Sequence, residues 1–281
     1  MIIVTGTKRS GTSMWMQALI AAGFPHIGEA FPGAWETFLK DANPRGFFES
    51  RLRQGIYYAT NPLRPSGIFL HPEATRRHAV KVFIPGVVRT DYAFLGRVLA
   101  TMRDWREYTL SLTRMYEFED RFTALRPLRD GETESDREAE AAQRRVHRGV
   151  LPPAVEWWFE NYALVRDVAV RRYPYHLVTY RRLLEDPEEE IGKVIRWIGE
   201  GDAAGAAAAI DRTLRTQAHG VVENPGVDAE AIAVFDELHD VVHRQGMLLP
   251  DLLSRMNALQ ARLDAEWKGR SRRNDELPDA G

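Results

Sequence analysis

The stretch MIIVTGTKRSGTSMW, residues 1–15, decides the fold of this chain. The residues of Ile2–Thr5 are mostly β-branched and apolar, which predicts a short buried strand of a parallel sheet. A loop with Gly6 and Gly11 follows, and apolar residues recur at helical spacing over Ser13–Ala22. A strand, a glycine loop and a helix in this order direct backbone N–H groups and the positive end of a helix dipole at a phosphate group.

The loop departs from the usual nucleoside-triphosphate loop in its basic residues. Gly6 and Gly11 keep the glycine spacing of that motif, but Thr12 occupies the position of its lysine. Basic residues lie inside the loop instead, at Lys8 and Arg9. Because kinases use the missing lysine together with Mg²⁺ on the β- and γ-phosphates, we expect this loop to bind a phosphate group of a different shape. An ordinary glycine turn between a strand and a helix is the alternative.

Composition limits the class of protein. The chain has 281 residues, of which 44% are hydrophobic and 28% are charged, as in soluble globular proteins with a substantial core. The net charge of −2 gives no general attraction to nucleic acid or to an anionic membrane, so an anion site must be local. The absence of cysteine excludes disulfides, thiolate catalysis and cysteine-ligated metals. The apolar start is too short for a signal peptide and no apolar run approaches a membrane span, so we expect a cytoplasmic protein.

Strands and helices alternate along the chain. Further strands are predicted at 79–84, 97–102 and 175–180. Helices are predicted near 107–116, 154–172, 188–198, 203–209, 228–245 and 251–267. This order predicts an α/β fold with a central parallel sheet flanked by helices, a helical C-terminal part, and a ligand at the carboxyl ends of the strands. We expect one domain over residues 1–267 and a flexible tail over 268–281.

One long segment has a different composition. Residues 118–150 are charged and weakly periodic, and the stretch 130–148 is dominated by charged side chains. A long segment of this kind suits a substrate lid. A solvated helix or a mobile flap is the alternative for 130–148, because charge runs usually lie on solvated surfaces.

The loop sequence K-R-S-G-T-S at residues 8–13 resembles the 5′-phosphosulfate-binding loop of sulfotransferases that use 3′-phosphoadenosine-5′-phosphosulfate (PAPS). The resemblance implies a P-loop-like sulfotransferase fold with PAPS as the sulfuryl donor. It implies that Arg9, beside the second basic residue Lys8, contacts the sulfuryl group. The donors to the 5′-phosphate would then be Ser10, Gly11, Thr12 and Ser13.

A second motif is MRDWREYTLSLTR, residues 102–114. It resembles the 3′-phosphate-binding segment of the same family, which implies that Arg103 and Ser111 hold the 3′-phosphate of the donor, although Trp105 replaces the usual proline. An arginine fork with a hydroxyl suits a dianion. The alternative is that Arg103 and Asp104 only pair with each other and cap the following helix.

A third segment, 180–199, resembles the family's strand-turn-helix segment whose tyrosine lies near the adenine. The resemblance implies that Tyr180 belongs to the cofactor pocket, whereas a tyrosine that only packs is the alternative. The family also places basic residues late in the chain against the 3′-phosphate. Arg212 or Arg215 meets this description, and Arg215 is our candidate.

Sulfuryl transfer needs a general base, cations on the transferred oxygens and in-line geometry. Phe83 stands where the cytosolic branch of the family has its histidine base, but N-P-R-G-F-F-E at 43–49 looks like a segment of bacterial relatives that use a glutamate. We hypothesise that Glu49 is the base, desolvated by Phe47 and Phe48. An acidic residue that only begins a helix is the alternative, and His26 and Asp41 are reserve candidates.

Lys81 precedes Phe83 at the end of the predicted strand and keeps the lysine of that family segment. The resemblance implies a role for Lys81 on the sulfate or the leaving group. A lysine that simply extends to solvent is the alternative. No metal is required for this chemistry, and the sequence contains no obvious cluster of metal ligands.

These observations predict a PAPS-dependent sulfotransferase that moves the sulfuryl group to a hydroxyl or an amine of an unidentified small-molecule or glycan acceptor. The nucleotide product would be 3′,5′-adenosine bisphosphate (PAP), and we expect no nucleic-acid partner. A P-loop kinase-like nucleotide enzyme is one alternative, which a need for Mg²⁺ and ATP would support. A non-catalytic nucleotide-binding module is the other, because Phe83 cannot accept a proton.

Overall fold

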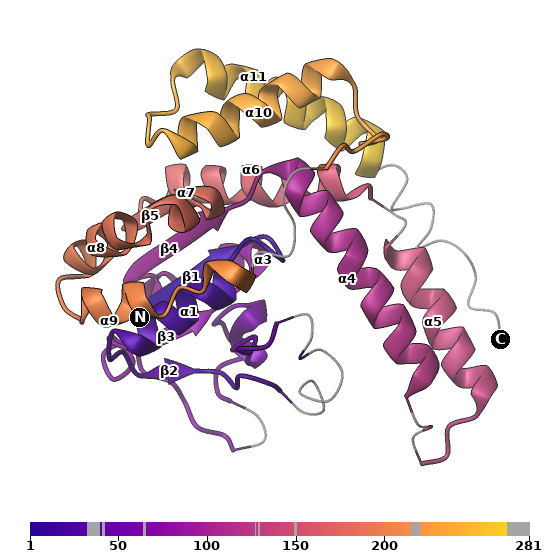
Figure 1. Cartoon of the computed structure of the whole chain (residues 1–281), viewed down its shortest axis with the longest axis horizontal. Helices are drawn as coiled ribbons and strands as arrows, with labels where there is room; N and C mark the ends of the chain where they lie inside the picture. The colour runs from indigo at the N-terminus through magenta and orange to yellow at the C-terminus, as the bar shows by residue number, and fades with distance from the viewer. Residues whose placement is uncertain are drawn as a thin grey trace.

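The computed structural model has an α/β fold built on one parallel sheet (Figure 1). It describes residues 1–32, 40, 43–63, 66–126, 128, 130–148, 151–214 and 220–268. Within that part of the chain the strands run in the order β2-β3-β1-β4-β5, and each adjacent pair is parallel. The strands are β1 (Ile2–Gly6), β2 (His26–Ile27), β3 (Ala79–Lys81), β4 (Arg97–Met102) and β5 (Tyr175–Thr179). The predicted central parallel sheet is therefore confirmed.

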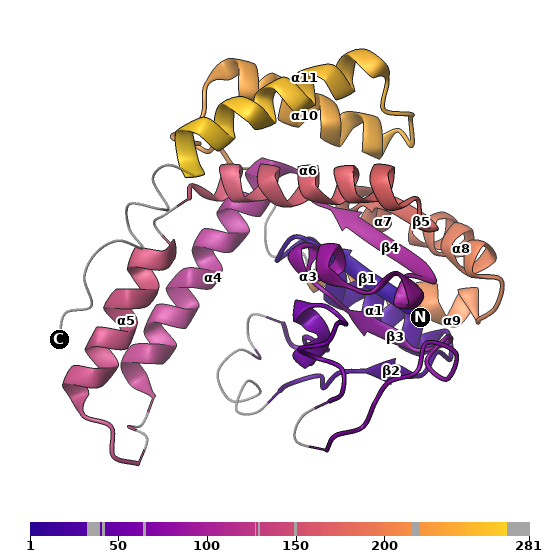
Figure 2. The ribbon, with the colours of Figure 1, turned by 180° about the vertical axis from the view of Figure 1, so that it is seen from behind.

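Helices cover both faces of the sheet because the side chains of each strand alternate between two apolar cores. Ile2 and Val4 of β1 pack with α1 (Thr12–Ala21), α8 (Pro187–Ile198) and α9 (Ala203–Ala208) on one face. Ile3 points to the other face, which η2 (Arg51–Gln54) and α3 (Ile84–Arg89) cover. Figures 1 and 2 show these two layers from opposite sides. The strand order changes direction at β1, so the loop after β1 lies at the switch point where ligands of such sheets bind.

A further core lies among helices that pack beyond the sheet. Its helices are α4 (Trp105–Leu125), α6 (Pro153–Arg171), α10 (Ala229–His243) and α11 (Pro250–Leu263), with the helical turn η5 (Asp264–Lys268) at the end. Trp157, Trp158 and Phe235 are fully buried there, and the rings of Trp158 and Phe235 stack with centroids 5.0 Å apart. The predicted helical C-terminal part is confirmed. No helix in the described residues combines the length and apolarity needed to cross a membrane.

The charged segment 118–150 is largely helical where the structure describes it. α4 continues to Leu125, and α5 (Glu134–Arg148) returns beside it, so the two helices project from the sheet as a pair in both views (Figures 1 and 2). Arg126, at the end of α4, is buried and pairs with Glu132 and with Glu140 at 2.9 Å. The described part of the segment is therefore helical, and its role as a substrate lid stays a prediction.

Several predicted boundaries move in the structure. The strand expected over 79–84 ends at Lys81, because α3 begins at Ile84 with a proline in its first turn. Glu49 does not begin a helix: it forms an isolated antiparallel bridge with Glu29, and the short helix η2 starts later, at Arg51. The two-residue strand β2 was not predicted, since so short a strand leaves no periodicity to detect.

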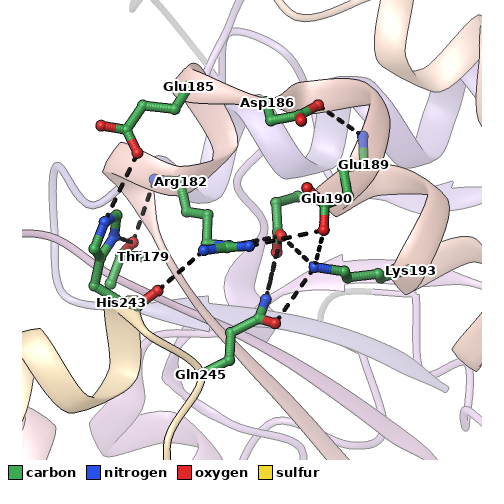
Figure 3. A network of polar contacts seen from close by, with 9 residues as sticks. All are labelled: Thr179, Arg182, Glu185, Asp186, Glu189, Glu190, Lys193, His243 and Gln245. Carbon is green, nitrogen blue, oxygen red and sulfur yellow. Dashed lines mark hydrogen bonds and ion pairs between the residues drawn. The ribbon is translucent and has the colours of Figure 1, made fainter.

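A buried polar network fastens the end of α10 to α7 (Tyr180–Glu185) and α8 (Figure 3). Glu190 is 0% exposed and accepts hydrogen bonds from Arg182 Nε at 2.8 Å, Lys193 Nζ at 2.9 Å and Gln245 Nε2 at 2.9 Å. Burial by itself would raise the pKa of Glu190, but the bonds from Lys193 and Arg182 outweigh it and the pKa lies below its usual value. His243 Nδ1 lies 2.9 Å from the hydroxyl of the last residue of β5.

Candidate functional site

The loop between β1 and α1 has the backbone shape of an anion site. Arg9 and Gly11 both have left-handed backbone conformations, with φ of 63° and 97°. A Cβ at Gly11 would lie 2.6 Å from Cδ2 of Tyr180, so only glycine fits there. Gly11 supplies no side-chain cap, and the first hydrogen bond of α1 runs from the N–H of Trp15 to the carbonyl of Gly11. The N–H groups of the first turn, which precede that bond, therefore point out of the helix start.

Two sequence motifs meet at this loop. Arg9 Nε donates to Ser111 Oγ at 3.2 Å, although the two residues are 102 positions apart in the chain. Arg103 Nη1 donates to the carbonyl oxygen of Arg9 at 2.9 Å, and the Arg103 guanidinium lies over the ring of Tyr180, 4.8 Å from its centroid. The sheet brings together the residues that the three motifs predicted. Arg9 lies in the loop after β1, Arg103 follows β4 and Tyr180 follows β5.

Positive charges crowd against one another here. Burial, and then the charges of Arg103 and Arg114, lower the pKa of Arg9 to about 10. Arg103 Nε also bonds to Glu107 at 3.1 Å, and both side chains are buried. Arg114 was not among the predicted residues. It is exposed on α4 one turn after Ser111, and this spacing of three residues on one helix face is the signal that identifies it.

A second cluster of charged groups lies at the start of α1. Lys81 is only 4% exposed and its Nζ donates to Ser13 Oγ at 3.3 Å, to the carbonyl of Phe47 at 3.1 Å and to Glu49 Oε1 at 3.1 Å. Burial lowers the pKa of Lys81, and the neighbouring Glu49 opposes that shift. Lys81 therefore does not extend to solvent, and the alternative reading of this residue is wrong. The structure brings Ser13, Glu49 and Lys81 together.

Glu49 is buried as expected but is held by two cations. Its Oε2 pairs with Arg53 Nη1 at 2.6 Å, while its Oε1 accepts from Lys81. Phe47, which precedes it, is buried. The ring of Phe83 lies 5.5 Å from Lys81 Nζ, so an apolar side chain stands beside this ammonium group. These contacts, which join residues far apart in the chain, were not readable from the sequence around Glu49.

The remaining predicted residues have different positions. Ser10 donates through its hydroxyl to the carbonyl of Thr7 at 2.7 Å, so this side chain holds the loop together. Lys8 faces α6, where its Nζ lies 3.7 Å from Glu156 Oε1. Thr12 is buried in the first turn of α1. Arg215 lies outside the described residues.

The reserve candidates are placed as follows. His26 lies in β2, with its ring edge-on to Phe48 at a centroid distance of 6.0 Å. Arg212 is exposed in the short helix η4 (Arg212–Leu214). Asp41 lies outside the described residues. Within the described ranges, no group of three or more His, Asp or Glu side chains is arranged to hold a metal ion.

Comparison of the sequence with models of protein families, and with curated proteins, found no match.

Proposed function

We propose that this chain is a sulfotransferase that takes the sulfuryl group of PAPS and passes it to a hydroxyl or an amine of an acceptor. The observation that carries the proposal is the 3.2 Å contact between Arg9 Nε and Ser111 Oγ. It joins the loop that resembles a 5′-phosphosulfate site to the segment that resembles a 3′-phosphate site. A nucleoside with phosphates at both positions needs two anion sites that lie side by side.

In the proposed donor complex, the N–H groups at the start of α1 and the hydroxyl of Ser13 hold the 5′-phosphate. Arg103 and Ser111 hold the 3′-phosphate, with the charge-assisted bonds that an arginine fork forms to a dianion. Tyr180, which packs on Gly11 and under Arg103, supports the adenine. Arg9, in the loop that holds the 5′-phosphate, contacts the sulfuryl group, as the resemblance of this loop implies.

The proposed step breaks the bond between the sulfur and the bridging oxygen of the 5′-phosphate, and forms a bond from the acceptor oxygen or nitrogen to the sulfur. The electron pair of the broken bond leaves on the phosphate of PAP, and the acceptor proton passes to the Glu49 carboxylate. Arg9 and Lys81 offset the charge that develops on the leaving oxygen. Because Lys81 is bonded to Glu49, a donor that draws Lys81 toward its own oxygens frees one carboxylate oxygen for the proton.

Ligand-induced thermal stabilisation tests the donor class. PAP at about 100 times its Kd should raise the melting temperature by about 5 °C, because a ligand that binds only the native state stabilises it. ATP with Mg²⁺ should give no comparable shift. A shift with ATP and Mg²⁺ and none with PAP would contradict the proposal and support the kinase-like alternative.

A non-catalytic nucleotide-binding module is the second candidate, and two observations favour it. Phe83 places an apolar ring beside Lys81, and both oxygens of Glu49 are bonded to cations. The two candidates differ in one measurement, the release of PAP from PAPS. A protein that binds PAP and never releases it from PAPS, with or without a panel of acceptors, is a binding module.

A further inference from the structure

Two carboxyl groups of α6 lie near Lys8 of the loop between β1 and α1. Glu156 and Glu160 are four residues apart, so they lie on one face of the helix. Glu156 has a long contact to Lys8, whose side chain is 42% exposed. Glu160 is half-buried and forms no hydrogen bond or ion pair with any residue that the structure describes. We call these two residues the α6 carboxyl pair.

A buried hydroxyl points at the pair. Tyr108 of α4 is 0% exposed, and its OH lies beside Glu156 but lacks a hydrogen bond of proper geometry among the described residues. Burial, and then the charges of Glu156 and Glu160, raise the pKa of Tyr108. A buried hydroxyl without a bond destabilises a protein, so this polar site lacks a partner.

A single cation serves both members of the pair. The groups that face the pair are Lys8 from the loop and Tyr108 from α4, so one ammonium stands beside two carboxyl groups. Burial, and then the charge of Glu156, raise the pKa of Glu160 to about 8, while Lys8 opposes that shift. Glu160 therefore keeps its proton near neutral pH, and a cation bound at the pair would replace that proton.

We infer that the α6 carboxyl pair binds a positively charged amine of the acceptor. The inference rests on the proposed function, because it takes the neighbouring loop as the donor site. When Lys8 turns to an anionic donor, the pair loses its one cation, and an ammonium group restores the balance. An anionic acceptor is repelled by the same two carboxylates. The acceptors of this protein are therefore amine-bearing molecules.

A charge series of phenols tests the inference. Tyramine, 4-ethylphenol and 3-(4-hydroxyphenyl)propionate share a phenol ring and carry a positive, a zero and a negative side-chain charge. Titration calorimetry measures the binding of each, with and without saturating PAP, to the wild-type protein and to the double variant Glu156→Gln/Glu160→Gln. Tyramine should bind at least about 10-fold tighter than 4-ethylphenol, and the propionate should bind weakest. In the double variant the three affinities should become equal.

The pH dependence adds a readout that a merely structural role would not give. Since a cation binds the deprotonated pair, tyramine should bind tighter as the pH rises from about 6.5 to about 8.5 in the wild type, and this trend should be absent in Glu160→Gln. Glu188→Gln, which removes an exposed carboxylate of α8, is the matched control and should behave as the wild type. The inference would be overturned if the three phenols bound the wild type with equal affinity, or if none of them bound. It would also be overturned if the double variant kept the preference for the positively charged phenol.

Failure of the inference and failure of the proposed function give different results. PAP binding is measured on the same proteins, and the glutamine variants should bind PAP as the wild type does because neither residue is a proposed donor contact. If PAP does not bind, the proposed function fails. If PAP binds and the charge series shows no preference, only the inference about the acceptor fails.

Discussion

The Glu190 network and the loop between β1 and α1 differ in how their buried charges are neutralised. At Glu190 one carboxylate is matched by Arg182, Lys193 and an amide, and its pKa is lowered as expected for a satisfied anion (Figure 3). At the loop, burial and then the charges of neighbouring guanidinium groups lower the pKa of Arg9. The first arrangement stabilises the fold without a ligand, and we propose that the second binds an anion.

The α6 carboxyl pair extends the comparison to negative charge. Glu190 is buried and Glu160 is half-buried; the pKa of Glu190 is lowered by its cations, and that of Glu160 is raised by burial and by Glu156. Buried groups with shifted pKa values concentrate at functional sites, which is why we propose a ligand for each of these two clusters, the loop and the α6 carboxyl pair.

Arg9→Ala should have the largest effect. It removes the cation that faces the transferred group, and the loss of one such donor lowers turnover by about 1000-fold. The rate of PAP release from PAPS measures this loss of turnover. Arg181→Ala, which removes an exposed arginine of α7 paired with Glu185, is the matched control and should leave turnover unchanged. Equal losses in the two variants would contradict the role of Arg9.

Glu49→Gln should lower PAP release by about 100-fold, because a general base contributes at least that much to a transfer step. PAP should bind the variant as tightly as the wild type, since Glu49 is not a proposed phosphate contact. Calorimetry and a turnover assay on the same preparation separate the two quantities. Turnover near that of the wild type would remove Glu49 from the role.

Glu190→Gln and Glu160→Gln should change stability in opposite directions. Glu190 has a lowered pKa, so its stabilisation is present above its unfolded pKa and is lost as the pH falls. Glu190→Gln should therefore lower the free energy of unfolding by roughly 1–3 kcal/mol at neutral pH, and the difference should shrink in acid. Glu160 has a raised pKa, so ionising it destabilises the fold as the pH rises toward 8. Glu160→Gln should be more stable than the wild type by roughly 2 kcal/mol at about pH 8.5.

Urea unfolding at three pH values checks both signs. A loss of stability in Glu160→Gln at alkaline pH, or a gain in Glu190→Gln at neutral pH, would reverse the comparison between the two carboxylates.

Arg114→Ala should have the smallest effect. The side chain is exposed, so solvent screens its charge, and we expect PAP to bind about 3- to 10-fold more weakly. The loss should diminish at high salt because it depends on a screened charge. A salt-independent loss would indicate that the variant disturbs α4 and not the anion site.

The sequence contained enough to predict the sheet and the meeting of the motifs. Arg9 and Arg103 follow strands that pattern and glycine spacing identify, and adjacent parallel strands end on the same edge. The helix start at Asp186 was also readable, since Asp186 caps α8 through the N–H of Glu189 ahead of an apolar face.

The contacts across the chain were not predictable. Lys81 reaches Glu49 because β3 lies beside β2 and the chain just after β2 bridges to Glu49, and nothing in the local sequence of Glu49 indicates its two cations. The α6 carboxyl pair could not be predicted, because the aromatic residues of α6 indicate only core packing. The groups beside the pair, Lys8 and Tyr108, lie on other elements. Partners set by tertiary structure leave no periodic signal in a sequence.

The central claim is that Arg9 with its loop, and Arg103 with Ser111, hold the two ends of one nucleoside bisphosphate. Titration calorimetry of PAP, adenosine 5′-monophosphate and adenosine 3′-monophosphate against the wild type and Arg103→Ala tests it most directly. We predict that PAP binds the wild type about 100-fold tighter than either monophosphate, and that Arg103→Ala binds PAP only as tightly as the 5′-monophosphate. Equal affinities of PAP and the 5′-monophosphate for the wild type would contradict the claim.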